Sequence, residues 1–363
     1  SELKDISKLS RIGGKTILMY IATTIIAVSI GLGVVNIVKP GTYIQEETRT
    51  ELMAQFGEQA AEKQQLALKQ QEAGPLQALV DIVPQNIMGA AASNRNMLQV
   101  IFFVIFFGVA LILIPEKKAK PVIDFFDSFN EAILKMIDLI MLAAPLGVFA
   151  LLAALVAKSP STDIFIALGA YGVCVVGGLA LMVFVFYPII LKMFTKVQPM
   201  DFFRAIAPAQ LLAFSTSSSA ATLPVTMECV EDNIGVSKNV SSFVLPIGAT
   251  VNMDGTSMYQ TIAVLFLAQL HMVDLTLAQQ LTIVLTATLA SIGSAAVPSA
   301  GLVMLMIVLI SVGLNPAWIA IIFPVDRILD MCRTVVNVTG DAAVSTIIAK
   351  GEGELNVKDE FDS

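Results

Sequence analysis

Residues 326–341 read DRILDMCRTVVNVTGD, and no other stretch of the chain constrains the fold as strongly. The flanking sequence is apolar, and a charge at the centre of a membrane helix costs about 2.5–3.5 kcal/mol on insertion scales. At about 100° per residue, the main polar residues share one helix face roughly 80° wide: Asp326, Asp330, Arg333, Asn337 and Asp341. The other side carries Ile328, Leu329, Val335 and Val336. We therefore expect a polar stripe turned inward on a helix that is otherwise compatible with lipid.

The charges of this stripe admit two interpretations. In the first, Asp330 and Arg333 form a structural ion pair, which leaves Asn337 and Asp341 unexplained. In the second, each residue has its own task. The planar guanidinium of Arg333 suits a substrate carboxylate. Asp330 would hold a substrate ammonium, and Asp341 would offer a hard oxygen to a monovalent cation.

The composition indicates a membrane protein. Hydrophobic residues make up 56% of the chain and charged residues 14%, with a mean hydropathy of +0.79, whereas soluble domains carry about 25% charged residues. Several apolar runs approach the roughly 20 residues that cross a bilayer as a helix: Thr16–Val38, Met97–Ile114, Ile133–Val156 and Ile164–Leu191. Because backbone groups in lipid need internal partners, we expect an all-α membrane protein built as a multi-span helical bundle.

Several functional classes lack support in the sequence. There is no basic patch to indicate a nucleic-acid partner, and much of the net charge of −7 lies near residues 46–72 and 352–362. No P-loop, His-Glu-x-x-His motif or Gly-x-Ser-x-Gly elbow is present, which argues against an enzyme or an ATP-driven machine. Cys174, Cys229 and Cys332 fit no zinc spacing, and we interpret them as packing residues.

The positions of Lys and Arg predict the orientation, because positive residues tend to stay on the cytoplasmic side of a membrane. Basic residues between positions 4 and 15 put the N-terminus inside, and the Lys residues at 117–120 and 192–196 then also fall inside. The acidic loop falls outside. We expect a multi-pass protein of the inner (plasma) membrane with both termini in the cytoplasm.

The second half of the chain repeats one arrangement. Residues 213–224 (AFSTSSSAATLP) and 291–301 (SIGSAAVPSAG) are small-residue stretches between short apolar arms. Each is followed by a helix with a polar interruption, at Asn252–Thr256 and at Asn337–Asp341. Paired interruptions of this kind point to a transporter binding site whose freed backbone groups bind ions and substrate. We predict two re-entrant helical hairpins and two broken helices, related as inverted repeats.

Two further polar features have alternative explanations. Asp254 lies in apolar surroundings, where a carboxylate is either protonated or paired with a cation. Oxygens of the neighbouring Asn252 and Thr256 favour a cation over a neutral, hydrogen-bonded Asp. The cluster Ser215–Ser219 is consistent with close helix packing, but the following Pro224 favours a helix tip.

At these motifs the sequence resembles the dicarboxylate/amino acid:cation symporter family, which includes the glutamate and aspartate transporters. Residues 217–224 and 291–301 resemble the two re-entrant tips of that family. Residues 252–256 match its Asn-Met-Asp-Gly-Thr motif, and residues 330–341 match its final-helix signature. The resemblance implies an elevator-type homotrimer that carries an acidic amino acid, or a related dicarboxylate, into the cell together with sodium.

The resemblance also implies how the chain is divided. Residues 40–158 would form the scaffold that trimerises, residues 1–39 and 159–350 would form a transport domain that slides past it, and residues 351–363 would form an acidic cytoplasmic tail. The hairpins would span about 203–238 and 275–312, and the second would be the extracellular gate. The first two transmembrane helices of the family are missing, so we expect an N-terminal truncation.

Matching positions assign binding roles. The substrate site would comprise Ser217, Ser218, Ser219, Thr256, Ala296, Val297, Gly301, Asp330, Arg333, Thr334 and Asn337. A first sodium site would use Asp341 with carbonyls of Gly248, Asn252 and Asn337. A second would use Thr250 and Met253 with Ser291, Ile292 and Ser294. A third would use Tyr20, Thr23 and Thr24 with Asn252 and Asp254.

Some departures and alternatives remain. Ala296 stands where many members have Gly, and Ser217 stands where some have Arg. Arg333 favours acidic substrates, because members for neutral amino acids lack a guanidinium there. Some relatives use protons, so a proton-coupled dicarboxylate or glutamate symporter is an alternative to the sodium-coupled one. An ion channel would need a continuous polar path, and an intramembrane serine hydrolase would need a base, whereas His271 is distant in sequence.

Overall fold

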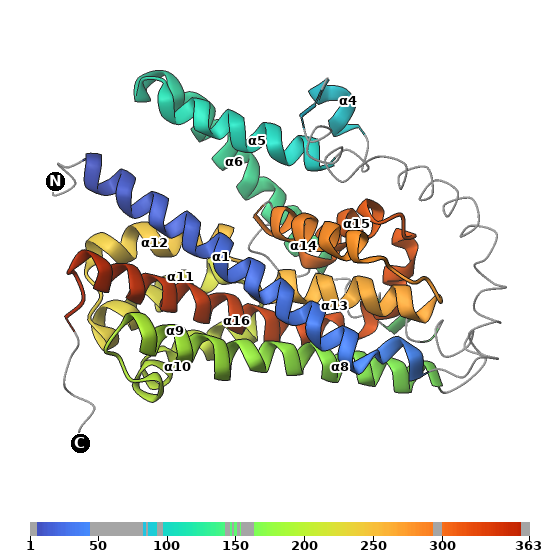
Figure 1. Ribbon diagram of the computed structural model, residues 1–363. Helices are drawn as coiled ribbons and strands as arrows, with labels where there is room; N and C mark the ends of the chain where they lie inside the picture. The colour runs from blue at the N-terminus through green and yellow to red at the C-terminus, as the bar shows by residue number, and fades with distance from the viewer. Residues whose placement is uncertain are drawn as a thin grey trace.

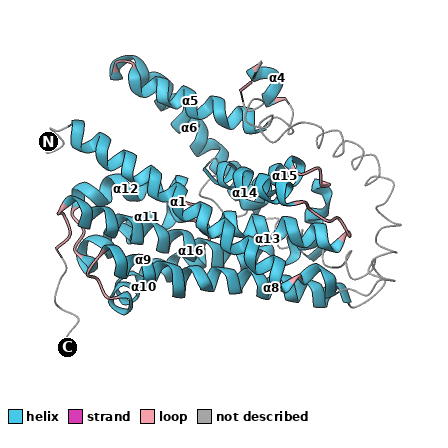
Figure 2. Ribbon diagram, in the orientation of Figure 1, coloured by secondary structure: helices cyan, strands magenta, loops and turns pink. Residues whose placement is uncertain are grey.

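The computed structural model describes residues 6–43, 83–84, 86–92, 97–141, 163–292 and 300–356, together with Leu146, Phe149, Ala150 and Ala153. Within these ranges the regular structure is helical (Figure 2), apart from one isolated antiparallel bridge between Val236 and Leu355. The predicted all-α fold is therefore confirmed.

The helices follow one another along the chain as labelled in Figure 1. In the first half they are α1 (Ile6–Val38), the 3-10 turn η1 (Pro40–Tyr43), α4 (Ile87–Ala91), α5 (Met97–Leu113), α6 (Glu116–Met141), α8 (Asp163–Leu181), the π-helical η3 (Met182–Phe186) and α9 (Tyr187–Phe194). In the second half they are α10 (Pro199–Thr216), α11 (Ser219–Glu228), the π-helical η4 (Cys229–Ile234), α12 (Lys238–Val251), α13 (Asp254–Leu270), α14 (Leu277–Ile292), α15 (Ala300–Ser311), η5 (Pro316–Trp318) and α16 (Ile319–Glu352).

A bundle around α1, α8, α13 and α16 forms the core, and Figure 1 shows these helices running side by side. Glycines permit their close approach. A Cβ added to Gly31 of α1 or to Gly178 of α8 would lie 2.9 Å from the side chain of Met258 in α13. Helices α5 and α6 lie to one side of this bundle (Figure 1).

Two helical segments are long and apolar enough, by length and composition, to cross a membrane: Arg11–Tyr43 and Asp163–Phe194. The predicted spans Thr16–Val38 and Ile164–Leu191 lie within them. The predicted span at 97–114 corresponds to α5, where Phe106 is 67% exposed and Ile112 is 83% exposed. The predicted span at 133–156 begins inside α6, and most of its remainder lies outside the described residues.

The first predicted hairpin is visible as α10 and α11, which pack on each other across a two-residue connection. Ser217 ends α10 in the left-handed conformation, with φ 53° and ψ 33°. Ser218 then caps α11, because its Oγ accepts a hydrogen bond from the backbone N–H of Ala221 at 3.1 Å. Helices α14 and α15 pack on each other in the same way, but the predicted second tip, at 293–299, lies outside the described residues.

Only one of the two predicted helix breaks is present. Helix α12 ends at Val251 and α13 begins at Asp254, with extended backbone at Asn252. The predicted break at residues 337–341 is wrong, because α16 runs through it without interruption. Gly340 serves close packing there instead: an added Cβ would lie 2.5 Å from Oη of Tyr187 and 2.7 Å from Nδ2 of Asn252.

The side of α16 opposite the polar stripe is less exposed than expected. Ile328 is 64% exposed, as a lipid-compatible surface requires, but Leu329 and Val336 are buried. They are covered because α8, α10, α12 and α13 all pack around this helix.

Candidate functional site

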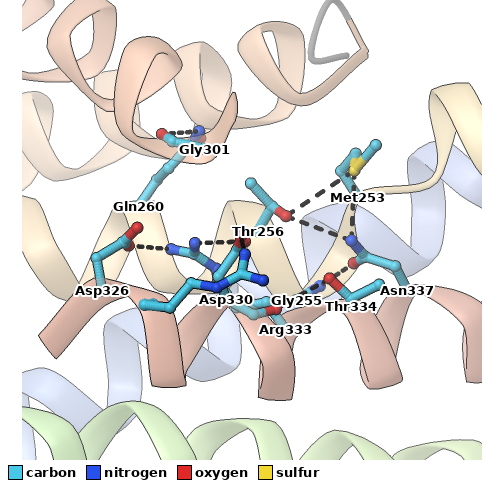
Figure 3. Close-up of polar contacts among 11 residues, drawn as sticks. Met253, Gly255, Thr256, Gln260, Gly301, Asp326, Asp330, Arg333, Thr334 and Asn337 are labelled. Atoms are coloured by element: carbon cyan, nitrogen blue, oxygen red, sulfur yellow. Dashed lines mark hydrogen bonds and ion pairs between the residues drawn. The ribbon is translucent and has the colours of Figure 1, made fainter. Parts of the chain in front are cut away.

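Arg333 is the centre of the polar stripe of α16 (Figure 3). Its side chain is fully buried, and its two terminal nitrogens donate to Asp326 Oδ1 at 2.9 Å and to Asp330 Oδ1 at 2.6 Å. The guanidinium carbon also lies 3.8 Å from the ring centroid of Tyr259 in α13, a cation–π contact. Nε of Arg333 has no hydrogen-bond partner among the described residues. The guanidinium is therefore held in place by α13 and by α16 itself.

The start of α15 in the second hairpin lies directly against this guanidinium. A Cβ added to Gly301 would lie 3.6 Å from the guanidinium carbon of Arg333 and 3.0 Å from Cγ2 of Thr256. Nε2 of Gln260 donates to the carbonyl of Gly301 at 3.3 Å (Figure 3). The structure thus brings together three residues of the predicted substrate site, Thr256, Gly301 and Arg333, from α13, α15 and α16.

Asn337 joins the break between α12 and α13 to α16. Its Oδ1 accepts from the backbone N–H of Gly255 at 2.8 Å, which satisfies one of the free donors at the start of α13. Its Nδ2 lies 3.3 Å from both Oγ1 of Thr256 and Sδ of Met253. One turn earlier, the hydroxyl of Thr334 donates to the carbonyl of Asp330 at 2.9 Å.

The residues of the predicted first sodium site meet at Asn252. Its Nδ2 donates to Asp341 Oδ1 at 2.9 Å and to the carbonyl of Asn337 at 3.1 Å, and its N–H donates to the carbonyl of Gly248 at 2.8 Å. A Cβ added to Gly248 would lie 2.4 Å from both Asp341 Oδ1 and Oη of Tyr20. Tyr20, from the predicted third site, therefore lies beside the first site.

Asp254 is fully buried and is surrounded by hydroxyl groups. Its Oδ1 accepts from Thr24 at 2.7 Å and from Thr23 at 3.3 Å, and its Oδ2 accepts from Tyr187 at 2.9 Å. Three of the five residues of the predicted third site, Thr23, Thr24 and Asp254, thus meet here, although α1 and α13 are distant in sequence.

Other residues of the predicted sites lie at the first tip, on α12, at the end of α14 or outside the described residues. Ser217, Ser218 and Ser219 are buried at the first tip, which α10 and α11 hold against α16. Thr250 is exposed, and its hydroxyl donates back to the carbonyl of Ile247 at 3.0 Å. Ser291 and Ile292 end α14, and their part in a second sodium site stays a prediction. The remaining members lie outside the described residues: Ser294, Ala296 and Val297.

Sequence reasoning did not include four residues that contact the site. Asp326 was placed on the stripe but given no role, while Tyr187, Tyr259 and Gln260 carried no signal beyond being polar in apolar helices. Tyr259 and Gln260 follow the Asn252–Thr256 motif by one turn, so helical periodicity could have pointed to them.

The buried charges do not balance. Among the described residues, Asp254, Asp326, Asp330, Asp341 and Arg333 are the buried Asp, Glu, Lys and Arg residues. The side chain of Glu352 is also only 2% exposed, but it is paired with Arg11 and Lys15. When ionised, these four buried carboxylates carry four negative charges against the single positive charge of Arg333, a formal surplus of three. The described residues hold no cluster of three or more His, Cys, Asp or Glu side chains able to bind a metal ion. Asp254 and Asp341 are instead single carboxylates with hydroxyl or carbonyl groups nearby, at a helix break of the kind whose backbone carbonyls coordinate ions in transporters.

Comparison with known proteins agrees with this geometry. Residues 1–351 match the sodium:dicarboxylate symporter family. Excitatory amino acid transporter 3 of Homo sapiens is 36% identical over 383 residues, which cover 95% of this chain and 73% of the relative. Excitatory amino acid transporter 2 of Rattus norvegicus is 34% identical, with 95% and 67% coverage. Neutral amino acid transporter B(0) of Oryctolagus cuniculus is 35% identical, with 93% and 66% coverage. This chain therefore belongs to the sodium:dicarboxylate symporter family and is a multi-pass membrane transporter, not an enzyme.

Proposed function

We propose that this protein carries an acidic amino acid, aspartate or glutamate, into the cell together with sodium ions. The observation that carries this proposal is the fully buried guanidinium of Arg333, which lies between two carboxylates and under the start of α15. A buried cation with this planar geometry suits a carboxylate ligand.

The surroundings of Arg333 supply groups for both ends of an amino acid. The side-chain acid would bind Arg333 beside Thr256, and the ammonium would bind Asp330. The hydroxyl of Ser217 at the first tip is buried and has no hydrogen-bond partner among the described residues, which makes it available to a substrate carboxylate. A neutral amino acid, the substrate named for one relative, would leave the guanidinium without that ligand.

Sodium would neutralise the remaining carboxylates. Asp341 with the carbonyls of Gly248 and Asn337, and Asp254 with Thr23 and Thr24, offer hard oxygens where the described residues place no Lys or Arg in contact. The formal surplus of three buried negative charges supports coupling to cations that travel with the substrate. The second sodium site, at Met253 and the end of α14, is proposed from the resemblance alone.

The same proposal divides the chain into a transport domain and a scaffold. The bundle of α1 and α8–α16 would be the transport domain, and residues 40–158, which include α5 and α6, would be the scaffold of a homotrimer. Exposed apolar side chains on α5 and α6, among them Phe106, Ile112 and Phe125, support contact with lipid or a neighbouring subunit. Both termini would lie in the cytoplasm.

The test is uptake of radiolabelled aspartate by the full chain reconstituted in liposomes. An inward sodium gradient should drive accumulation, and replacement of sodium by choline should abolish it. Accumulation driven by a pH gradient without sodium would establish the proton-coupled alternative instead. Competition by unlabelled glutamate, succinate and alanine would then rank the substrates.

A further inference from the structure

Helices α1 and α16 meet at two places. At the first, Asp341 Oδ1 and the hydroxyl of Tyr20 each lie 2.4 Å from the point that a Cβ of Gly248 would occupy, so they are within twice that distance of each other. At the second, Glu352 accepts from Arg11 and from Lys15, each at 2.6 Å. The second place lies at the end of the bundle where α1 begins and α16 ends (Figure 1).

Along each of the two helices, one buried hydroxyl lies between the residues that make these contacts. Thr16 precedes Tyr20 by one turn on the buried face of α1, and Ser345 follows Asp341 by one turn on α16. Both side chains are fully buried. Neither hydroxyl has a hydrogen-bond partner among the described residues.

Unpaired hydroxyls are unusual in this environment, because a buried donor without a partner costs free energy. A serine or threonine in a helix can bond to the carbonyl four residues earlier. Thr346, the neighbour of Ser345, does this with Ala342 at 2.7 Å. Thr16 and Ser345 do not, so their oxygens remain available to a mobile ligand.

We propose that the interface of α1 and α16 between Asp341 and Glu352 is a polar passage for the coupling cation, with the hydroxyls of Thr16 and Ser345 as its intermediate ligands. This rests on the proposed function, in which Asp341 holds sodium. Hydroxyl groups offer hard oxygen ligands, the kind that hard cations prefer. Glu352 does not trap the cation at the end of the passage, because its carboxylate is already paired with both Arg11 and Lys15, which gives this cluster a formal charge of +1. The passage would open toward the cytoplasm.

The test removes each hydroxyl while keeping its volume nearly constant. In Thr16→Val and Ser345→Ala, sodium loss after rapid dilution, followed by release of bound radiolabelled aspartate, should be about tenfold slower than in the wild type. This corresponds to about 1.4 kcal/mol on the barrier. The sodium concentration for half-maximal aspartate binding should stay unchanged, because the site at Asp341 is intact. Thr346→Val, which removes a paired hydroxyl one residue away, is the matched control and should release sodium at the wild-type rate.

The outcomes test the proposed passage separately from the proposed function. Wild-type rates in both variants would overturn the passage while leaving sodium binding in place. A higher melting temperature with unchanged rates would show that the hydroxyls are merely unpaired groups, and would also overturn it. If either variant folds poorly, Thr16→Ser and Ser345→Thr should restore both yield and rate. Failure of the wild type to bind aspartate in a sodium-dependent way would instead refute the proposed function.

Discussion

The carboxylates on the stripe and those near the helix break have different partners. Asp326 and Asp330 face the guanidinium of Arg333. Asp254 and Asp341 receive hydrogen bonds from neutral donors, namely the hydroxyls of two threonines and a tyrosine and the amide of Asn252. The first cluster contains its own cation and can exchange one ion pair for another with a charged ligand. The second lacks a protein cation within its described contacts, so its charge calls for an ion from solution. Buried carboxylates can therefore serve different ligands. Those paired with a protein cation suit a charged substrate, and those that contact only neutral donors suit a free cation.

The largest expected effect comes from removing the cation of the first cluster. Arg333→Ala should lower aspartate uptake by roughly a hundredfold, because removing one partner of a buried charge pair costs about 2–5 kcal/mol of binding free energy. Sodium-dependent binding of a neutral amino acid should persist, measured by competition in liposomes. Arg327→Ala is the matched control, because this Arg is 43% exposed and lies 3.9 Å from Asp330. Undiminished aspartate affinity in Arg333→Ala would refute the role assigned to the guanidinium.

The next effect concerns the charge of the second cluster. Asp341→Asn and Asp254→Asn keep the shape of the side chain but remove its charge, so the sodium concentration needed for half-maximal uptake should rise about ten- to a hundredfold. The ranking of competing substrates should not change, because Arg333 is untouched. Altered substrate ranking with unchanged sodium dependence would mean that the two clusters have been assigned the wrong ligands.

A smaller effect tests the contact between the second hairpin and the first cluster. Gly301→Ala adds a Cβ 3.0 Å from Thr256 and 3.6 Å from the guanidinium. Because overpacking costs about 1–3 kcal/mol, aspartate affinity should fall about tenfold in equilibrium binding assays. Gly33→Ala, where an added Cβ meets no atom within 4 Å, is the control. Equal affinities of the two variants would exclude close contact of α15 with the bound substrate.

The smallest effect concerns a single hydroxyl. Tyr187→Phe removes the donor to Asp254 Oδ2. The net contribution of such a hydrogen bond to a charged group is about 1.5–3 kcal/mol, part of which a bound sodium ion replaces, so sodium affinity should weaken severalfold. The sodium titration of aspartate binding measures this. If Tyr187→Phe weakened sodium affinity as much as Asp254→Asn does, this would indicate that Tyr187 binds the ion itself.

Much of the site followed from local patterns. The stripe from Asp326 to Asp341 was predicted from helical periodicity, and all of its polar residues named at the outset are buried. The break at Asn252 was predicted from its polar residues and is present. The same reasoning failed at residues 337–341, because Gly340 can interrupt a helix or allow another side chain to approach it. Sequence composition does not distinguish these two uses.

Local chemistry thus specified which segments are helical, which faces are polar and which groups are costly to bury, because periodicity and hydropathy depend on neighbours along the chain. Packing established the rest. Thr24 contacts Asp254 across 230 residues, and Tyr20 approaches Asp341 over the bare backbone of Gly248. Contacts of this kind depend on how side chains from separate helices pack against one another. That packing is decided only when the helices assemble.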